Sequence, residues 1–168
     1  MIDTFQTERL RADHLGELTA MHNDPRVMAT LGGVRTEEQS RRFHEESLDH
    51  WERYGHGIWV LRDRTDGRFV GRGGIRHVTL DGVDEVEVAY VLMAESWGKG
   101  LATEMATKFL QLAWGSLALS QLVCFTMTTN LKSRCVMEKV GFRYERDMSH
   151  HGLPHVLYRM FSPDRLVP

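Results

Sequence analysis

The chain has 168 residues, of which 42% are hydrophobic and 26% are charged, and its formal net charge at pH 7 is −2. This length and balance predict one globular domain, residues 1–168, and exclude a disordered chain. Because the charge is close to zero, we expect neither nucleic acid nor an anionic membrane surface as a partner.

Cysteine usage and hydropathy point to an ordinary cytoplasmic protein. The two cysteines, Cys124 and Cys135, are too few for a disulfide framework, and no CxxC pair offers a zinc site, so we expect no metal. The first residues contain no apolar signal core, and no apolar run approaches the roughly 18 residues that span a bilayer. The sequence leaves a homodimer open.

The first half of the chain predicts helices and then a hairpin. We expect a short strand at residues 9–12 and a helix from Leu15 to about Asn23. Thr36, followed by two glutamates, predicts the start of a second helix that ends near Tyr54, before Gly55. Residues 58–62 and 68–74 predict two strands joined by an Asp-Gly turn, with residues 75–80 as an extension of the second strand or a loop.

The second half alternates strands and helices. Residues 85–93 alternate and then become continuously apolar, which predicts a central strand that is buried on both faces at its end. Helices are expected at residues 103–116 and 131–140, and strands at 121–128 and 156–161. This order predicts an α/β fold with a mixed sheet and helices on both faces.

A glycine loop, residues 97–104 (WGKGLATE), joins the central strand to the following helix. Helix N-termini carry unpaired N–H groups and a partial positive charge, and glycine lets the backbone approach an anion closely. The nucleotide loop GxxxxGKS/T fits poorly because Gly100 follows Lys99, and the dinucleotide motif GxGxxG would need glycine at Thr103. A turn that opens a helix and binds nothing is the plainer alternative.

Residues 90–104 (YVLMAESWGKGLATE) resemble the acetyl-CoA motif of the GCN5-related N-acetyltransferase (GNAT) superfamily. The ribosomal-protein N-terminal acetyltransferase (RimJ/RimL-type) branch is most similar, and it often has tryptophan at the position of Trp97. Further segments resemble this branch in the same order: residues 7–10 (TERL), 70–75 (VGRGGI), 130–133 (NLKS) and 138–142 (EKVGF).

The resemblance implies a mostly antiparallel sheet whose fourth and fifth strands splay apart, near Leu92 and Phe125, to admit acetyl-CoA. Unpaired strand amides and carbonyls would then bind the pantetheine arm. On this basis we expect coenzyme A to contact Val91, Leu92, Met93, Gly98, Lys99, Gly100, Leu101, Ala102, Thr103, Asn130 and Ser133. An exposed lysine at Lys99 and a helix cap at Asn130 are simpler alternatives.

The resemblance further implies that an acetyl group is transferred to a primary amine, either of a protein N-terminus or of a small molecule. Such an amine must lose a proton, and Glu87 is the leading candidate for the general base. Glu85, His150 and His151 are alternatives. Many relatives have a tyrosine as proton donor where this chain has Met137, which leaves Ser133 as the candidate acid.

Two further possibilities remain open. A catalytic cysteine is conceivable at Cys135, although we expect this residue to pack in the core. The missing tyrosine also favours an alternative function, a catalytically weak protein of the same fold that only binds acyl-CoA.

Overall fold

The structure is a computed structural model that describes residues 4–163. In chain order its elements are β1 (Phe5–Arg9), the 3₁₀ turn η1 (Ala12–His14), α1 (Leu15–His22), α2 (Pro25–Met28), α3 (Glu37–Tyr54), β2 (Ile58–Asp63), β3 (Phe69–Leu80), β4 (Val83–Leu92), the 3₁₀ turn η2 (Ala94–Ser96), α4 (Leu101–Trp114), β5 (Gln121–Met127), α5 (Leu131–Val140), β6 (Arg143–His150) and β7 (Leu153–Phe161).

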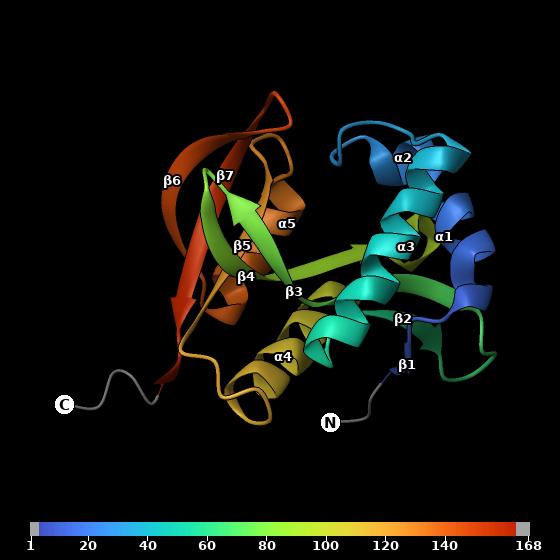
Figure 1. The fold of residues 1–168 in the computed structure, drawn as a ribbon, viewed down its shortest axis with the longest axis horizontal. Coiled ribbons are helices and arrows are strands. Elements are labelled where there is room, and N and C mark those ends of the chain that lie inside the picture. Colours follow the sequence, from blue (N-terminus) through green and yellow to red (C-terminus); the bar gives the residue numbers. More distant parts are fainter. Residues whose placement is uncertain (1–3, 164–168) are drawn as a thin grey trace. The chain divides into compact units, whose positions relative to one another are not determined.

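The strands form one sheet in the hydrogen-bonded order β1-β2-β3-β4-β5-β7-β6 (Figure 1). The pairs β1–β2, β2–β3, β5–β7 and β6–β7 are antiparallel, and β4–β5 is parallel. Between β4 and β5 the described pair is Glu87 opposite Val123, whereas β5 pairs with β7 from Gln121 to Met127. The predicted mixed sheet is confirmed, and the splay of β4 from β5 near Leu92 and Phe125 stays a prediction.

The chain divides into two compact units. The N-terminal unit comprises the described residues up to Gly74 together with Tyr90–Leu101. The C-terminal unit comprises Ile75–Ala89 and the described residues from Ala102 onward. Strands β3 and β4 therefore contribute residues to both units.

In the N-terminal unit, α1 packs against α3 (Figure 1). The Thr36 hydroxyl accepts a hydrogen bond from the Gln39 N–H at 3.2 Å, and the Gln39 side chain accepts one from the Thr36 N–H at 2.9 Å. This reciprocal cap fixes the predicted start of α3. The helix ends at Gly55, which has a left-handed φ of 70°, as the sequence predicted.

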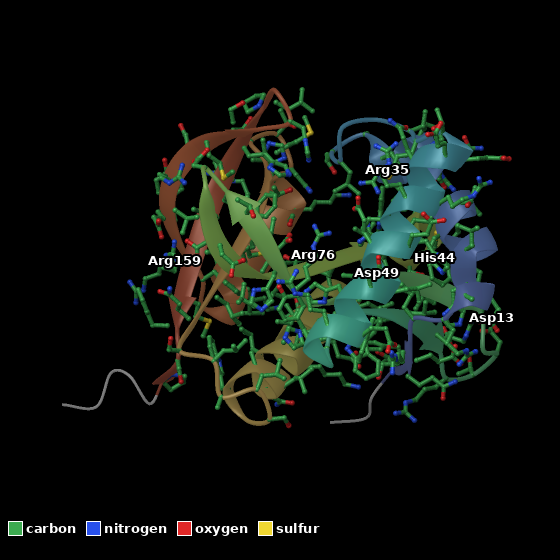
Figure 2. The ribbon with its side chains drawn as sticks, viewed as in Figure 1. Asp13, Arg35, His44, Asp49, Arg76 and Arg159 are labelled. Atoms are coloured by element: carbon green, nitrogen blue, oxygen red, sulfur yellow. The ribbon has the colours of Figure 1, made fainter. Side chains whose placement is uncertain are left out.

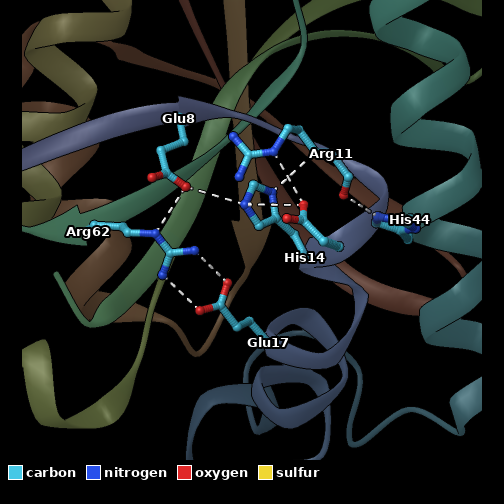
Figure 3. Close-up of polar contacts among 7 residues, drawn as sticks. Glu8, Arg11, His14, Glu17, His44 and Arg62 are labelled. Atoms are coloured by element: carbon cyan, nitrogen blue, oxygen red, sulfur yellow. Dashed lines mark hydrogen bonds and ion pairs between the residues drawn. The ribbon is translucent and has the colours of Figure 1, made fainter.

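An ion-pair network connects α1 to β1 and β2 (Figure 3). The Arg62 guanidinium donates to Glu17 at 2.7 and 2.9 Å and to Glu8 at 3.0 Å. The hydrogen bond from Arg62 lowers the pKa of the Glu8 carboxyl. The imidazole of His14 is buried and its Nε2 lies 3.3 Å from Glu8. Arg62 thereby joins α1 to β1, and Glu8 lies between Arg62 and His14.

The core of the N-terminal unit supports the end of β4. Met21, Val27 and Met28 are buried together, and half-buried side chains pack against them, including Val91 and Met93. The apolar side of the chain just before the glycine loop is therefore anchored on α1 and α2.

In the C-terminal unit, α5 packs against β5 and β6. Leu80, Val123, Met148 and Leu157 form a buried cluster. Arg159 adds a polar bridge: its guanidinium donates to both carboxylate oxygens of Glu85, at 2.7 and 3.0 Å, and to Glu145 at 2.5 Å. This bridge connects β4, β6 and β7.

Several predicted element boundaries were wrong. The first strand is Phe5–Arg9 rather than residues 9–12, because the Arg11 N–H donates to the imidazole of His14 and not to a strand. The sequence analysis missed β6, which has six polar or charged residues among its eight. On β4 the fully buried consecutive pair is Glu87–Val88, and residues 89–91 are half-buried. None of the helices within residues 4–163 combines the length and apolarity needed to cross a membrane.

Candidate active site

The glycine loop has the backbone that the sequence predicted. Gly98 and Gly100 have left-handed φ angles of 74° and 78°, and nothing lies within 4 Å of the position that a Cβ would take at either residue. Non-glycine residues adopt this conformation only at a cost. Leu101 then begins α4, so the glycines stand immediately before the free N–H groups of a 14-residue helix.

Hydrogen bonds fix the backbone that leads from β4 into this loop. The Met93 N–H donates to the Val70 carbonyl at 3.0 Å, and the Met93 carbonyl accepts from the Ser96 N–H at 2.9 Å. The Trp97 indole N–H donates to the Leu92 carbonyl at 3.1 Å. The Val91 carbonyl also lies against β3, next to Gly71, so of the three predicted strand residues the Leu92 N–H is the best placed to bind pantetheine, and contact with Val91 and Met93 stays a prediction.

Lys99 is exposed, and its charge contributes to lowering the pKa of Asp63 at the end of β2, after larger contributions from the hydrogen bonds to Thr65. The position of its ammonium group is therefore compatible with either a solvated lysine or a contact to a bound phosphate. The side chain of Leu101 is buried, and those of Ala102 and Thr103 are half-buried. The predicted contacts of these three residues with coenzyme A therefore depend on their backbone amides.

Asn130 and Ser133 lie together in the C-terminal unit, at the start of α5. The Asn130 side chain accepts a hydrogen bond from the Ser133 N–H at 3.3 Å and donates to Thr126 at 2.9 Å. Asn130 is thus the N-cap of α5, which is the simpler of the two roles considered for it. Contact of either side chain with coenzyme A stays a prediction.

The two candidate glutamates of β4 are both paired with arginine, Glu87 with Arg76 and Glu85 with Arg159; the two arginines are labelled in Figure 2. Glu87 is buried and accepts a hydrogen bond at 2.8 Å from Nε of Arg76 on β3. Glu85 is held by Arg159 in a two-pronged contact. Glu87 also occupies the described β4–β5 pair, opposite Val123. Of the two glutamates, Glu87 is the one at the parallel contact between β4 and β5.

The candidate histidines lie at the β6–β7 hairpin, whose turn is His151–Gly152, with both residues at positive φ. The imidazole of His150 packs edge-on against Phe125, with ring centroids 4.9 Å apart, and lies near His151 and His155. Burial first, and then the charges of His151, His155 and Arg76, lower the pKa of His150 to about 4. Within residues 4–163 no group of histidine, cysteine, aspartate and glutamate side chains has the arrangement of a metal site.

Two residues of α5 bear on the proton donor and on the possible cysteine nucleophile. Met137, at the position of the tyrosine expected from the resemblance, is 1% exposed and belongs to the core. Cys135 was expected to be buried, but it is exposed, because it lies on the side of the helix away from Met137. No imidazole contact to Cys135 is recorded among the described residues, so the structure offers it no activating base.

One polar cluster was missed by the sequence analysis. It consists of His22, Arg35, Ser40, Phe43 and Arg72 and is called the Phe43 cluster below. Burial first, and then the positive charges of Arg72 and Arg35, lower the pKa of His22 to about 3. These residues carry no motif and come from four segments of the chain, so only the folded structure brings them together.

Protonation of His22 should make the folded protein less stable as the pH falls. The unfolded chain binds a proton near its ordinary pKa of about 6.5, whereas the folded chain does so only near 3, so stability is lost as pH falls from about 6.5 to 3. We expect this group to lower the free energy of unfolding by roughly 2 kcal/mol between pH 7 and pH 5. Urea unfolding at both pH values measures it. His22→Gln should lose this part of the difference, whereas His77→Gln, at the surface beside Asp84, should keep it.

Comparison with known proteins agrees with this geometry. Residues 7–143 match the acetyltransferase (GNAT) domain family. The FsC-acetyl coenzyme A-N(2)-transacetylase of Aspergillus fumigatus is 30% identical over 155 residues, which cover 84% of this chain and 65% of that relative.

Solved structures share the fold. A GnaT-family acetyltransferase from Bordetella pertussis superposes with a TM-score of 0.82 at 23% identity, covering 95% of this chain and 96% of that one. RimL, a ribosomal L7/L12 α-N-protein acetyltransferase in complex with coenzyme A, has a TM-score of 0.77 at 12% identity, covering 96% of each chain. Since the family match spans most of the sequence, the chain belongs to the GNAT family and is an acetyl-CoA-dependent acyltransferase.

Proposed function

We propose that this protein transfers the acetyl group of acetyl-CoA directly to a primary amine while both substrates are bound. The observation that carries the proposal is the glycine loop, in which two left-handed glycines with open Cβ positions precede the N-terminus of α4. Backbone N–H groups at such a helix start suit a pyrophosphate. Gly98, Gly100 and the amides of Leu101 to Thr103 are the groups proposed to hold it, with Lys99 as an added charge.

The thioester end of the cofactor is proposed to follow the end of β4. The pantetheine arm carries amides that can pair with a strand edge, and the Leu92 N–H and the backbone of Val91 are its proposed partners. The hydrogen bonds of Met93 and Trp97 support this by holding the same backbone rigid. A rigid site keeps the thioester in one orientation, which favours reaction in a ternary complex.

The reaction forms one C–N bond and breaks one C–S bond. The neutral amine attacks the thioester carbonyl, and its nitrogen then loses a proton to a base. The thiolate of coenzyme A departs and takes up a proton. Glu87 is the proposed proton acceptor because it matches the glutamate found early in the fourth strand of the branch that the sequence resembles, and Arg76 fixes its carboxylate in position. Ser133 or solvent supplies the proton to the thiolate, since Met137 has none to give.

Amine acceptors are supported by the names of the compared proteins, one of which is an N(2)-transacetylase and the other an α-N-protein acetyltransferase. Because this chain covers 65% of the first of these, only the reaction class is carried over from it. A primary amine of a small molecule or of a peptide is therefore the proposed acceptor.

The proposal is tested with the purified wild-type chain. We expect isothermal titration calorimetry to show binding of coenzyme A, and a chromogenic thiol reagent to show thiol release from acetyl-CoA that depends on an added amine. Mass spectrometry of the acceptor should show the added acetyl group. Binding without transfer to any amine would favour the alternative, an acyl-CoA-binding protein without turnover, and failure to bind coenzyme A would rule out both.

A further inference from the structure

The end of β4 lies against β3 in close backbone contact. The Met93 N–H donates to the Val70 carbonyl at 3.0 Å. A Cβ at Gly71 would lie 2.4 Å from the Val91 carbonyl oxygen and 3.1 Å from the Cα of Leu92, so the two strands approach each other this closely because the residue is glycine. The Val91 carbonyl and the Met93 N–H therefore both face β3.

Leu92 lies between these two residues, and its own backbone groups face the other way. Strands β3 and β4 are joined by the two-residue turn Asp81–Gly82, so they run antiparallel. In an antiparallel pair, residues that exchange hydrogen bonds with the partner strand alternate with residues that do not. The N–H and the carbonyl of Leu92 consequently point away from β3, on the side where a pantetheine arm can pair with them.

The Trp97 side chain takes up one of these two groups, since its indole N–H donates to the Leu92 carbonyl at 3.1 Å. Trp51, on α3, makes the same kind of bond, from its indole N–H to the Ile58 carbonyl at 2.7 Å. Trp51 is 6% exposed, whereas Trp97 is 40% exposed. Burial of the ring therefore stabilises the fold less at Trp97 than at Trp51, and packing alone does not account for the bond to Leu92.

The polarity of the group that remains on Leu92 matters for acyl transfer. With its carbonyl bonded to the indole, Leu92 presents its N–H, which donates to a carbonyl oxygen. During transfer the amine nitrogen forms a bond to the thioester carbon, an electron pair moves onto the carbonyl oxygen, and that pair returns as the C–S bond breaks. A donor beside this oxygen stabilises the charge that develops there, whereas a second carbonyl oxygen would repel it.

We propose that Trp97 is a positioning residue for acyl transfer: its indole N–H occupies the Leu92 carbonyl, so that Leu92 presents its N–H to the thioester oxygen of acetyl-CoA. This inference rests on the proposed function and adds a side chain to it. Val70, Gly71 and residues 91–97, which make the contacts that carry it, all belong to the N-terminal unit. Without the indole N–H, the Leu92 carbonyl can accept from an amide N–H of the pantetheine arm, which displaces the thioester along the strand.

The test removes the N–H and keeps an aromatic ring at position 97. Replacement of Trp97 by benzothienylalanine exchanges the indole N–H for a sulfur atom at nearly the same shape, and Trp97→Phe removes it together with part of the ring. In both variants we expect kcat with saturating amine to fall about threefold to tenfold, which corresponds to the loss of one hydrogen bond. KM for acetyl-CoA should change by less than about twofold, because the released carbonyl binds the arm in another register.

Infrared difference spectra provide a readout that a loss of packing does not change. Acetyl-CoA that is isotopically labelled at the thioester carbonyl is bound in the absence of amine. In the wild type its carbonyl stretch should move to lower wavenumber, because a hydrogen bond to the oxygen weakens the C=O bond. This movement should be smaller in both Trp97 variants.

Trp51→Phe is the matched control, because it removes an indole bond to a backbone carbonyl in the same unit. It should lower the temperature of thermal unfolding and keep the wild-type kcat and carbonyl stretch. An unchanged carbonyl stretch in both Trp97 variants, or an equal loss of kcat in Trp51→Phe, overturns this inference while the proposed function stands. A wild-type chain that binds no coenzyme A, or transfers to no amine, overturns the proposed function as well.

Discussion

Replacing Gly100 by glutamate is expected to lower the affinity for coenzyme A by about a hundredfold to a thousandfold, or roughly 3 to 4 kcal/mol. Gly100 has a φ of 78°, which costs a side-chain-bearing residue about 1–2 kcal/mol. The new carboxylate would also extend into the open space before α4 and accept the same N–H groups that are proposed for the pyrophosphate. Titration calorimetry with coenzyme A measures the loss.

Gly82→Glu provides the control for this prediction. Gly82 has a φ of 79°, nothing lies within 4 Å of its Cβ position, and it belongs to the turn between β3 and β4. The substitution therefore adds the same side chain at the same backbone cost in another place. The affinity of the Gly82→Glu protein for coenzyme A should equal that of the wild type. Equal affinities for all three proteins would show that the pyrophosphate is bound elsewhere.

The parts of the site that the sequence predicted are those in which one short segment determines its own conformation. Glycine adopts left-handed φ angles without strain, as Gly98 and Gly100 do, and Thr36 with Gln39 caps α3 through contacts within four residues. The glycine loop and the limits of α3 were therefore predicted from the residues alone, and the family match agrees with the motif from which the cofactor was inferred.

Parts that depend on tertiary contacts were not predictable in this way. Strand β6 lies at the edge of the sheet and has polar residues along most of its length, so alternation of apolar residues did not mark it. The Met93 N–H is taken up by Val70, some twenty residues earlier in the chain. No sequence motif reports such a bond, which is why Met93 was grouped with Val91 and Leu92.

The Phe43 cluster illustrates the same limit more strongly. Its arginines are separated in the chain by the whole of α3 and β2. The only local sign was the position of Arg35 beside the predicted start of α3. His22 is buried because α1 packs against α3, and this burial is the main cause of its lowered pKa.

Glu87→Gln is expected to lower kcat about a hundredfold to a thousandfold, with a small change in KM for acetyl-CoA. Loss of a positioned general base typically costs this much. Glutamine has the same shape and still accepts the hydrogen bond from Nε of Arg76, so the fold around β3 and β4 should persist. Steady-state kinetics with saturating amine, together with thermal unfolding of the variant, measure the two effects separately.

Two further variants show whether the loss belongs to this carboxylate. Glu85→Gln removes a charge from the same strand, but Glu85 is held by Arg159, so kcat should change less than threefold if only Glu87 accepts the proton. His150→Gln removes the competing base, an imidazole that a pKa of about 4 keeps neutral at pH 7 but also makes a weak proton acceptor. A large loss of kcat in His150→Gln, with Glu87→Gln close to wild type, would transfer the role of base to the β6–β7 hairpin. The ion pair of buried Glu87 and half-buried Arg76 would then be a structural contact of β3 and β4, because an ion pair that does not touch the substrate contributes only to the fold.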